Sequence, residues 1–237
     1  MSDVSGSSAN PNPRIAPRPD VVVFDVNETL SDMSPMGQRF VDVGAPRHLA
    51  ATWFAGLLRD GFALTSAGTC PSFVDLGAGL LRVQLAGVAL NREVEESVGY
   101  IMAGFNGLAL HPDVPAGIAA LADSGFRLVT LSNGAAGVAA GLFERAGIRD
   151  RFEQLLSVED AQVWKPAPGS YAYALEQCKV PPSAALLVAV HPWDIDGAHR
   201  AGLSTAWVNR TGAPYPDYFE RADVEVALLG DLVSLIS

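Results

Sequence analysis

The sequence predicts an α/β fold in which a doubly wound parallel sheet carries an inserted helical domain. A run of β-branched and aromatic residues over 21–24 ends at Asp25 and a polar turn, which is typical of a buried parallel strand. From about residue 109 onward, strand-like and helix-like stretches alternate. Residues 36–108 instead show helical periodicity without an evident strand. We therefore expect this block to cover the ligand-binding edge of the sheet.

Composition limits the functional classes. The chain has 237 residues, of which 49% are hydrophobic, enough for one large domain with an insertion. Its net charge of −10 argues against nucleic acid and anionic membranes as partners, but not against a small anionic substrate. Cys70 and Cys178 form no metal-like cluster and suit a reduced, cytoplasmic protein. We find no membrane-spanning run and no secretory signal.

The chain divides into three parts. Residues 1–19 are rich in Ser, Pro and Asn and predict a disordered tail. Residues 20–35 and 109–237 form the predicted core domain, and residues 36–108 the helical cap. Glycines and prolines make 31–46 loop-like, with room for a short helix. In the rest of the cap we expect three helices: one from about Leu49 that stops at Gly61, one over 73–88, and one capped by Asn91.

The predicted core elements alternate along the chain. They are the strand 21–25, a helix from 113–115 to 124–125, the strand 126–131, a helix ending at Arg145, the strand 155–157, a helix over 168–178, the strands 184–190 and 205–209, and a helical turn at 232–236.

Polar side chains follow three of these strands, and a lysine precedes the helix at 168–178. They are Asp25 to Thr29, Ser132-Asn133, His191 to Asp194, and Lys165. The carboxyl ends of parallel strands share one edge, so these groups could converge there. A desolvated Asp25 could be a nucleophile kept ionised by Lys165, with hydroxyl and amide groups fixing the carboxylate or the substrate. The alternatives are helix caps or turns for Asp25, Thr29 and Ser132, and a surface position for Lys165.

These motifs resemble the haloacid dehalogenase superfamily, and most closely its 2-haloacid dehalogenase (type II) branch. The matching segments are Phe24-Asp25-x-x-x-Thr29-Leu30, Leu131-Ser132-Asn133-Gly134, Ser157 through Pro166, Trp193-Asp194, and Trp207 through Gly212. The resemblance covers about residues 20–237. It implies a Rossmann-like core with a helical cap inserted after the first strand.

The resemblance also implies a mechanism and roles for residues. In that family the matching aspartate attacks the halogen-bearing carbon, halide leaves, and water hydrolyses the resulting ester. Carried over, Asp25 is the nucleophile, Thr29, Ser132 and Lys165 orient it, and Asp194 positions or activates the water. The implied substrate-side residues are Val26, Asn27, Phe54, Asn133, Tyr171 and Trp193. The family reaction uses no metal and no organic cofactor, and its members often form homodimers.

Two departures argue against the superfamily's Mg²⁺-dependent phosphatases, which are the alternative function. Such enzymes need a second aspartate two residues after the nucleophile as an acid/base, and here that position is Asn27. Their metal-binding aspartate would fall near Val190, which cannot ligate a hard cation, and Asp196 lies at the wrong offset.

Other departures lie within the dehalogenase branch. Phe54 stands where familiar members carry a cap arginine, and Arg59 lies on a different helix face. Ala189 and His191 replace a serine and an asparagine. We expect His191 to replace missing polar contacts by donating to the departing halide or activating water, the alternative being an ordinary loop histidine. Trp53, Phe54 and Trp193 would narrow the pocket toward haloacetates, fluoroacetate included.

The predicted function is therefore metal-independent hydrolytic dehalogenation of short 2-haloalkanoic acids to 2-hydroxy acids through an aspartyl ester. A small-molecule phosphatase and a non-catalytic binding protein that keeps the fold are the competing hypotheses.

Overall fold

The computed structural model describes residues 15–237. The disordered tail was predicted for residues 1–19, of which residues 1–14 lie outside this range. Residues 15–19, which we had assigned to that tail, pack on the core. The backbone N–H of Ile15 donates to the Leu235 carbonyl (2.9 Å), and the Arg18 guanidinium lies 4.2 Å from the centre of the Phe126 ring. The packed part of the chain therefore begins earlier than expected.

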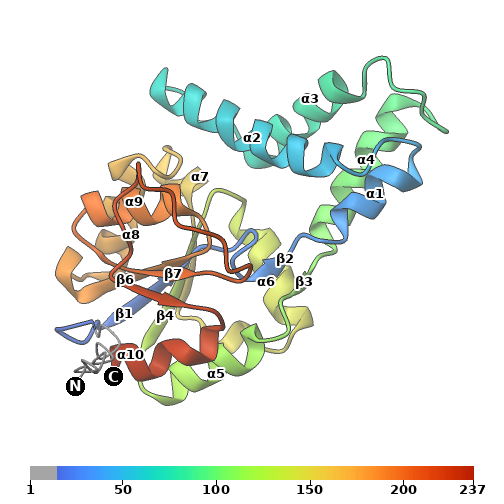
Figure 1. Cartoon of the computed structure of the whole chain (residues 1–237). Helices are drawn as coiled ribbons and strands as arrows, with labels where there is room; N and C mark the ends of the chain where they lie inside the picture. The colour runs from blue at the N-terminus through green and yellow to red at the C-terminus, as the bar shows by residue number, and fades with distance from the viewer. Residues whose placement is uncertain (1–14) are drawn as a thin grey trace, which may run out of the picture.

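The core contains a six-stranded parallel sheet in the order β5-β4-β1-β6-β7-β8 (Figure 1). The strands are β1 (Val21–Phe24), β4 (Arg127–Ser132), β5 (Gln154–Ser157), β6 (Ala185–Ala189), β7 (Ser204–Val208) and β8 (Val224–Val226). In register, Phe24 lies opposite Thr130 on one neighbour and Val188 on the other. All four residues of β1 are buried, as expected for a strand covered on both faces.

Helices cover both faces of the sheet (Figure 1). Val22 and Phe24 belong to an apolar cluster with the helices α5 (Val114–Asp123), α6 (Ala136–Arg145) and α10 (Val233–Ile236). The alternate residues Val21 and Val23 belong to a second cluster with α8 (Pro168–Cys178) and α9 (Pro192–Arg200). This two-sided packing confirms the predicted α/β class.

Four cap helices lie on one side of the core (Figure 1). They are α1 (Met36–Asp42), α2 (Leu49–Ser66), α3 (Phe73–Leu85) and α4 (Val94–Asn106). The two chain connections between cap and core run side by side, because β2 (Ser31–Asp32) pairs antiparallel with β3 (Ala109–Leu110). Cap residues share an apolar cluster with core residues, so the cap packs directly against the core.

Four short elements complete the fold: η1 (Arg149–Arg151), α7 (Val158–Ala161), η2 (Pro182–Ala184) and η3 (Leu229–Leu232). Between residues 15 and 237, no helix combines the length and the apolar character needed to cross a bilayer.

Three helix boundaries predicted in the cap are wrong. Helix α3 ends at Leu85 rather than at residue 88. Helix α2 continues through Gly61 to Ser66, and a Cβ at Gly61 would lie 2.4 Å from two ring atoms of Trp164. Gly61 is therefore a site of close approach between cap and core rather than a helix stop. Helix α4 begins after Glu93, not after Asn91, whose side-chain amide donates to the Asp42 carbonyl (3.0 Å).

Candidate active site

Asp25 follows β1 directly and is held through both carboxylate oxygens. It is almost fully buried, with 3% of its surface exposed. The Thr29 hydroxyl donates to Oδ2 (2.6 Å), and the Lys165 ammonium donates to Oδ1 (3.0 Å). Thr29 Oγ1 in turn accepts from the backbone N–H of Val190 (3.1 Å). The end of β6 therefore fixes the threonine that fixes Asp25.

A single buried lysine serves two carboxylates. Lys165 Nζ also donates to Asp194 Oδ2 (2.5 Å), and the Tyr171 hydroxyl donates to Asp194 Oδ1 (2.6 Å). Lys165, Asp194 and Tyr171 are fully buried. Burial favours the neutral form of the amine, but Asp194 and Asp25 outweigh it and raise the pKa of Lys165. We therefore assign Lys165 as a permanent cation.

The two carboxylates that share this lysine have opposite pKa shifts. Burial raises the pKa of Asp25, but Lys165, His191 and the Thr29 hydroxyl together outweigh burial, so that the pKa of Asp25 is lowered. Burial also raises the pKa of Asp194, and there Lys165 does not overcome it. Environments that separate the pKa values of neighbouring carboxyl groups give them different roles. The lowered pKa of Asp25 favours its ionised form, which is the form that nucleophilic attack requires.

Ser132 and Asn133 follow β4, next to β1. The Asn133 side chain accepts from the Lys165 N–H (2.9 Å) and donates to the Lys165 carbonyl (3.3 Å). It therefore holds the lysine backbone, whereas we had expected it beside the substrate. Ser132 Oγ accepts from the Gly134 N–H (2.9 Å), and none of the hydrogen bonds found over residues 15–237 joins it to Asp25.

His191 lies between the core and the cap. It precedes α9, and its Nε2 is 3.2 Å from the Asn27 carbonyl oxygen and 3.8 Å from Asp25 Oδ2. Its ring stacks on Trp193, with centroids 5.0 Å apart, and lies 6.4 Å from the ring of Phe54 on α2. The loop histidine of the sequence is thus the imidazole that faces the nucleophile.

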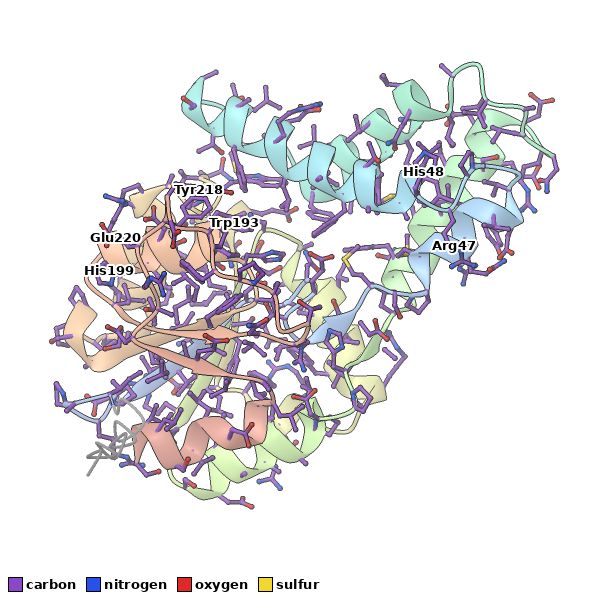
Figure 2. All side chains as sticks on the ribbon, viewed as in Figure 1. Arg47, His48, Trp193, His199, Tyr218 and Glu220 are labelled. Atoms are coloured by element: carbon purple, nitrogen blue, oxygen red, sulfur yellow. The ribbon has the colours of Figure 1, made fainter. Side chains whose placement is uncertain are left out.

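The aromatic residues predicted to narrow the pocket lie in different places. Trp53 is fully buried inside the cap, where its Nε1 donates to the Gly77 carbonyl (3.0 Å), so it does not face Asp25. Trp193 lies on the core surface that faces α2, where its ring meets Phe62 with centroids 5.0 Å apart (Figure 2). Arg59 is exposed and pairs with Asp60, consistent with its expected helix face.

A small cavity lies between core and cap. Val26, Asn27 and Ser132 line it from the core, and Phe73 and Phe105 line it from the cap. Its volume is about 10 Å³, room for about one water molecule. Tyr171 was predicted to lie beside the substrate. It does not line this cavity, and its hydroxyl donates to the buried carboxylate of Asp194.

The side chains considered as metal ligands are otherwise engaged. Asp196 pairs with Arg200 (2.9 Å) and accepts from the Glu220 N–H (3.0 Å). Within the described range, no three His, Cys, Asp or Glu side chains are grouped so as to hold a metal ion.

One residue near the nucleophile is not among the residues predicted for the site. Glu28 follows Asn27 in the turn after β1 and takes a left-handed backbone conformation, with φ +64°. Its Oε2 lies 3.6 Å from His191 Nε2. In the sequence, a single acidic residue in a polar turn is typical of the solvent-exposed surface. The left-handed backbone of Glu28 and its proximity to His191 distinguish it from an ordinary surface glutamate.

The fold and this arrangement define a hydrolase of the haloacid dehalogenase-like family, to which the chain belongs: that family's model matches residues 19–202. A haloacetate dehalogenase H-2 from Moraxella sp. (strain B) is 32% identical over 126 residues, 53% of this chain and 56% of that protein. An (S)-2-haloacid dehalogenase from Pseudomonas sp. (strain YL) is 29% identical over 216 residues, covering 90% of this chain and 93% of that one.

A solved structure agrees with these relatives. L-2-haloacid dehalogenase from Xanthobacter autotrophicus, with chloropropionic acid covalently bound, superimposes with a TM-score of 0.82 at 27% identity, over 92% of this chain and 98% of that one.

Proposed function

We propose that this protein hydrolyses the carbon–halogen bond of short 2-haloalkanoic acids and forms the 2-hydroxy acid through an ester on Asp25. The observation that carries the proposal is the buried Asp25 carboxylate at the end of β1, held by Lys165 and Thr29, which also lower its pKa. The relatives named for haloacetate and (S)-2-haloacid dehalogenation support it. So does the neighbouring structure with covalently bound chloropropionic acid.

The reaction divides into two steps. An Asp25 oxygen bonds to the halogen-bearing carbon while the carbon–halogen bond breaks, and halide leaves with the bonding electrons. Water then adds to the Asp25 Cγ, and the bond from Cγ to the oxygen that carries the substrate carbon breaks. One water proton ends on the hydroxy acid and the other is released to solvent. Because attack on carbon occurs once, from the side opposite the halide, a chiral substrate is inverted.

The contacts suggest how neighbouring groups assist. Lys165 and Thr29 fix the orientation of Asp25 for attack, which places the reacting oxygen before substrate arrives. Both oxygens of Asp194 are bound by buried donors. We therefore propose that Asp194 acts through Lys165, by keeping it charged and in place, rather than directly on water. His191 Nε2 is placed to donate toward Asp25 or the halide.

The decisive experiment is a halide-release assay over fluoro-, chloro- and bromoacetate and both enantiomers of 2-chloropropionate. We expect release that EDTA does not reduce, inversion with the chiral substrate, and loss of activity in Asp25→Asn. After a single turnover in ¹⁸O-water, label should appear in the Asp25 carboxylate. An unlabelled Asp25 would exclude the ester, and Mg²⁺-dependent hydrolysis of p-nitrophenyl phosphate without halide release would favour the phosphatase. A binding protein would release no halide at all.

We also propose a preference for short substrates, with fluoroacetate among them. The ring of His191, which faces Asp25, stacks on Trp193 and lies 6.4 Å from Phe54, and these bulky neighbours favour a small substrate such as a haloacetate. The fluoroacetate arm of the assay tests whether a donor at His191 suffices for a poor leaving group, and His191→Ala should lose activity there.

The cellular setting and assembly are also proposals. Cys70 and Cys178 are free thiols, which supports a reducing, cytoplasmic compartment. We propose a homodimer as well, and light scattering on the purified protein would measure its mass.

A further inference from the structure

The turn after Asp25 contains an unusual residue. Glu28 has φ +64°, a left-handed conformation that glycine adopts without cost. A residue with a Cβ loses about 1–2 kcal/mol there. A glutamate at this position is therefore an expensive choice for folding, and strain of this kind is concentrated at functional sites.

The Glu28 side chain meets the imidazole that faces the nucleophile. Three oxygens surround His191 Nε2: the Asn27 carbonyl at 3.2 Å, Glu28 Oε2 at 3.6 Å and Asp25 Oδ2 at 3.8 Å. All three are acceptors, so a bare Nε2 lone pair would be repelled by each of them. The contacts therefore place a proton on Nε2.

Other elements fix this arrangement. His111 Nε2 lies 2.9 Å from the Glu28 carbonyl oxygen and secures the turn from the core side. The ring of His191 lies between Phe54 and Trp193, which bring no charge. Burial and Asp25 raise the pKa of Glu28, and His191 and His111 lower it without offsetting them, so the pKa of Glu28 is raised on balance. The charged groups around the imidazole are thus Glu28 and Asp25, with Lys165 on the far oxygen of Asp25.

We propose that Glu28 is a positioning residue that keeps His191 aimed at the Asp25 oxygens with its proton on Nε2. This inference rests on the proposed function. Its importance grows during the reaction, because ester formation removes the negative charge of Asp25. Of the two carboxylates near His191, Asp25 is neutral in the ester, and Glu28 is the one that still attracts the imidazole. Negative charge then develops on the Asp25 oxygens when water attacks Cγ, where a fixed donor is most effective.

The proposal predicts which step depends on Glu28. During ester formation two carboxylates attract His191, whereas during ester hydrolysis Glu28 is the remaining one, beside the neutral Asn27 carbonyl. Removing the Glu28 charge should therefore slow hydrolysis more than halide release in the first turnover.

The test compares Glu28→Gln with wild type in rapid-quench and steady-state assays on bromoacetate. We expect steady-state turnover to fall about tenfold, the order of one lost charge-assisted contact, while first-turnover halide release changes less than about twofold. A halide burst should appear, and intact-protein mass spectrometry should detect the ester. Equal loss in both phases, or no loss in either, would overturn the proposal.

A glycine variant separates this role from a folding role. Glu28→Gly should show the same burst while its melting temperature stays level or rises, because the strain is released. Lys179 offers a matched control, since it is exposed and also left-handed, with φ +57°. Lys179→Gly should raise stability similarly without changing kinetics. A Glu28→Gly protein that loses both stability and activity would indicate a structural role and contradict the inference.

A measurement on the free protein, without substrate, separates the test of Glu28 from the test of the proposed dehalogenase activity. Imidazole ¹⁵N NMR of wild type should show the His191 proton on Nε2. A proton on Nδ1 alone would overturn the inference even if halide release is normal. Absence of halide release from wild type with the proton on Nε2 would count against the proposed function.

Discussion

Replacing Lys165 with methionine tests the charge arrangement at the centre of the site. Methionine keeps much of the length of the side chain and removes its charge. Lys165 is fully buried and lies within 3.0 Å of Asp25 and 2.5 Å of Asp194. Removing one partner of a buried ion pair costs about 3–5 kcal/mol, because it leaves uncompensated buried charge. We expect a decrease of this order in the free energy of unfolding of Lys165→Met at pH 8.

The stability lost in Lys165→Met should also depend on pH, which tests the charge arrangement more specifically than the loss at one pH. In wild type, the pKa of Asp25 is lower in the folded than in the unfolded state. Asp25 therefore stabilises the fold at pH values above its unfolded-state pKa, and this contribution is lost as the pH falls through the folded-state pKa. Without the lysine, burial raises the pKa of both Asp25 and Asp194. The folded variant then binds a proton that the unfolded chain has released, so the variant recovers relative stability as pH falls toward about 4. One such proton is worth about 1.4 kcal/mol per pH unit.

Urea unfolding at pH 8, 6.5 and 5 measures this effect. The stability deficit of Lys165→Met should shrink steadily toward pH 5, and halide release should be abolished at every pH. Lys179→Met, at an exposed lysine, should show neither change. A deficit that is the same at all three pH values would mean that the carboxylates are not buried against each other, and it would refute this description of the site.

Three further substitutions test packing and hydrogen bonds. Gly61→Ala should lower stability by about 1–3 kcal/mol, since its Cβ would lie 2.4 Å from the Trp164 ring, and an unchanged thermal midpoint would contradict that contact. Ser72→Ala removes the side-chain cap of α3 and should cost about 1 kcal/mol in urea unfolding; no loss would mean that the cap is not formed. Tyr171→Phe leaves an oxygen of Asp194 without its donor and should cost about 1–3 kcal/mol in the same assay, whereas a neutral result would place a solvent molecule there.

The hydrophobic pattern was sufficient to predict the class of fold but not every element. Strand β1 was predictable because every residue in it is apolar and buried on both faces. Strand β8 was missed because it has three residues at the sheet edge, with an exposed glutamate at its centre. Helix α9 was missed because its sequence is rich in polar residues: Asp194 binds Lys165 in the site, and Asp196 pairs with Arg200. Gly61 was misjudged because a glycine that admits a distant tryptophan has the same local sequence signal as a helix stop.

The sequence was sufficient to predict which residues meet at the site, but not which side chains contact one another there. Strand β1 lies between β4 and β6, so the residues after these strands had to meet near Asp25. The partners of each side chain depend on the paths of the loops, which periodicity does not report. Asn133 illustrates this limit: its amide pairs with the backbone of Lys165, 32 residues further along the chain.

The sharing of Lys165 has a consequence for substrate binding. One cation between two carboxylates has no charge to spare for the carboxylate of an anionic substrate. Arg59 points to solvent and pairs with Asp60, so the cap does not supply that charge from this position. The imidazole of His191 also faces Asp25, with Nε2 3.8 Å from Oδ2. Lys165 is therefore committed to Asp25 and Asp194, and the carboxylate of the substrate has to be bound by other groups.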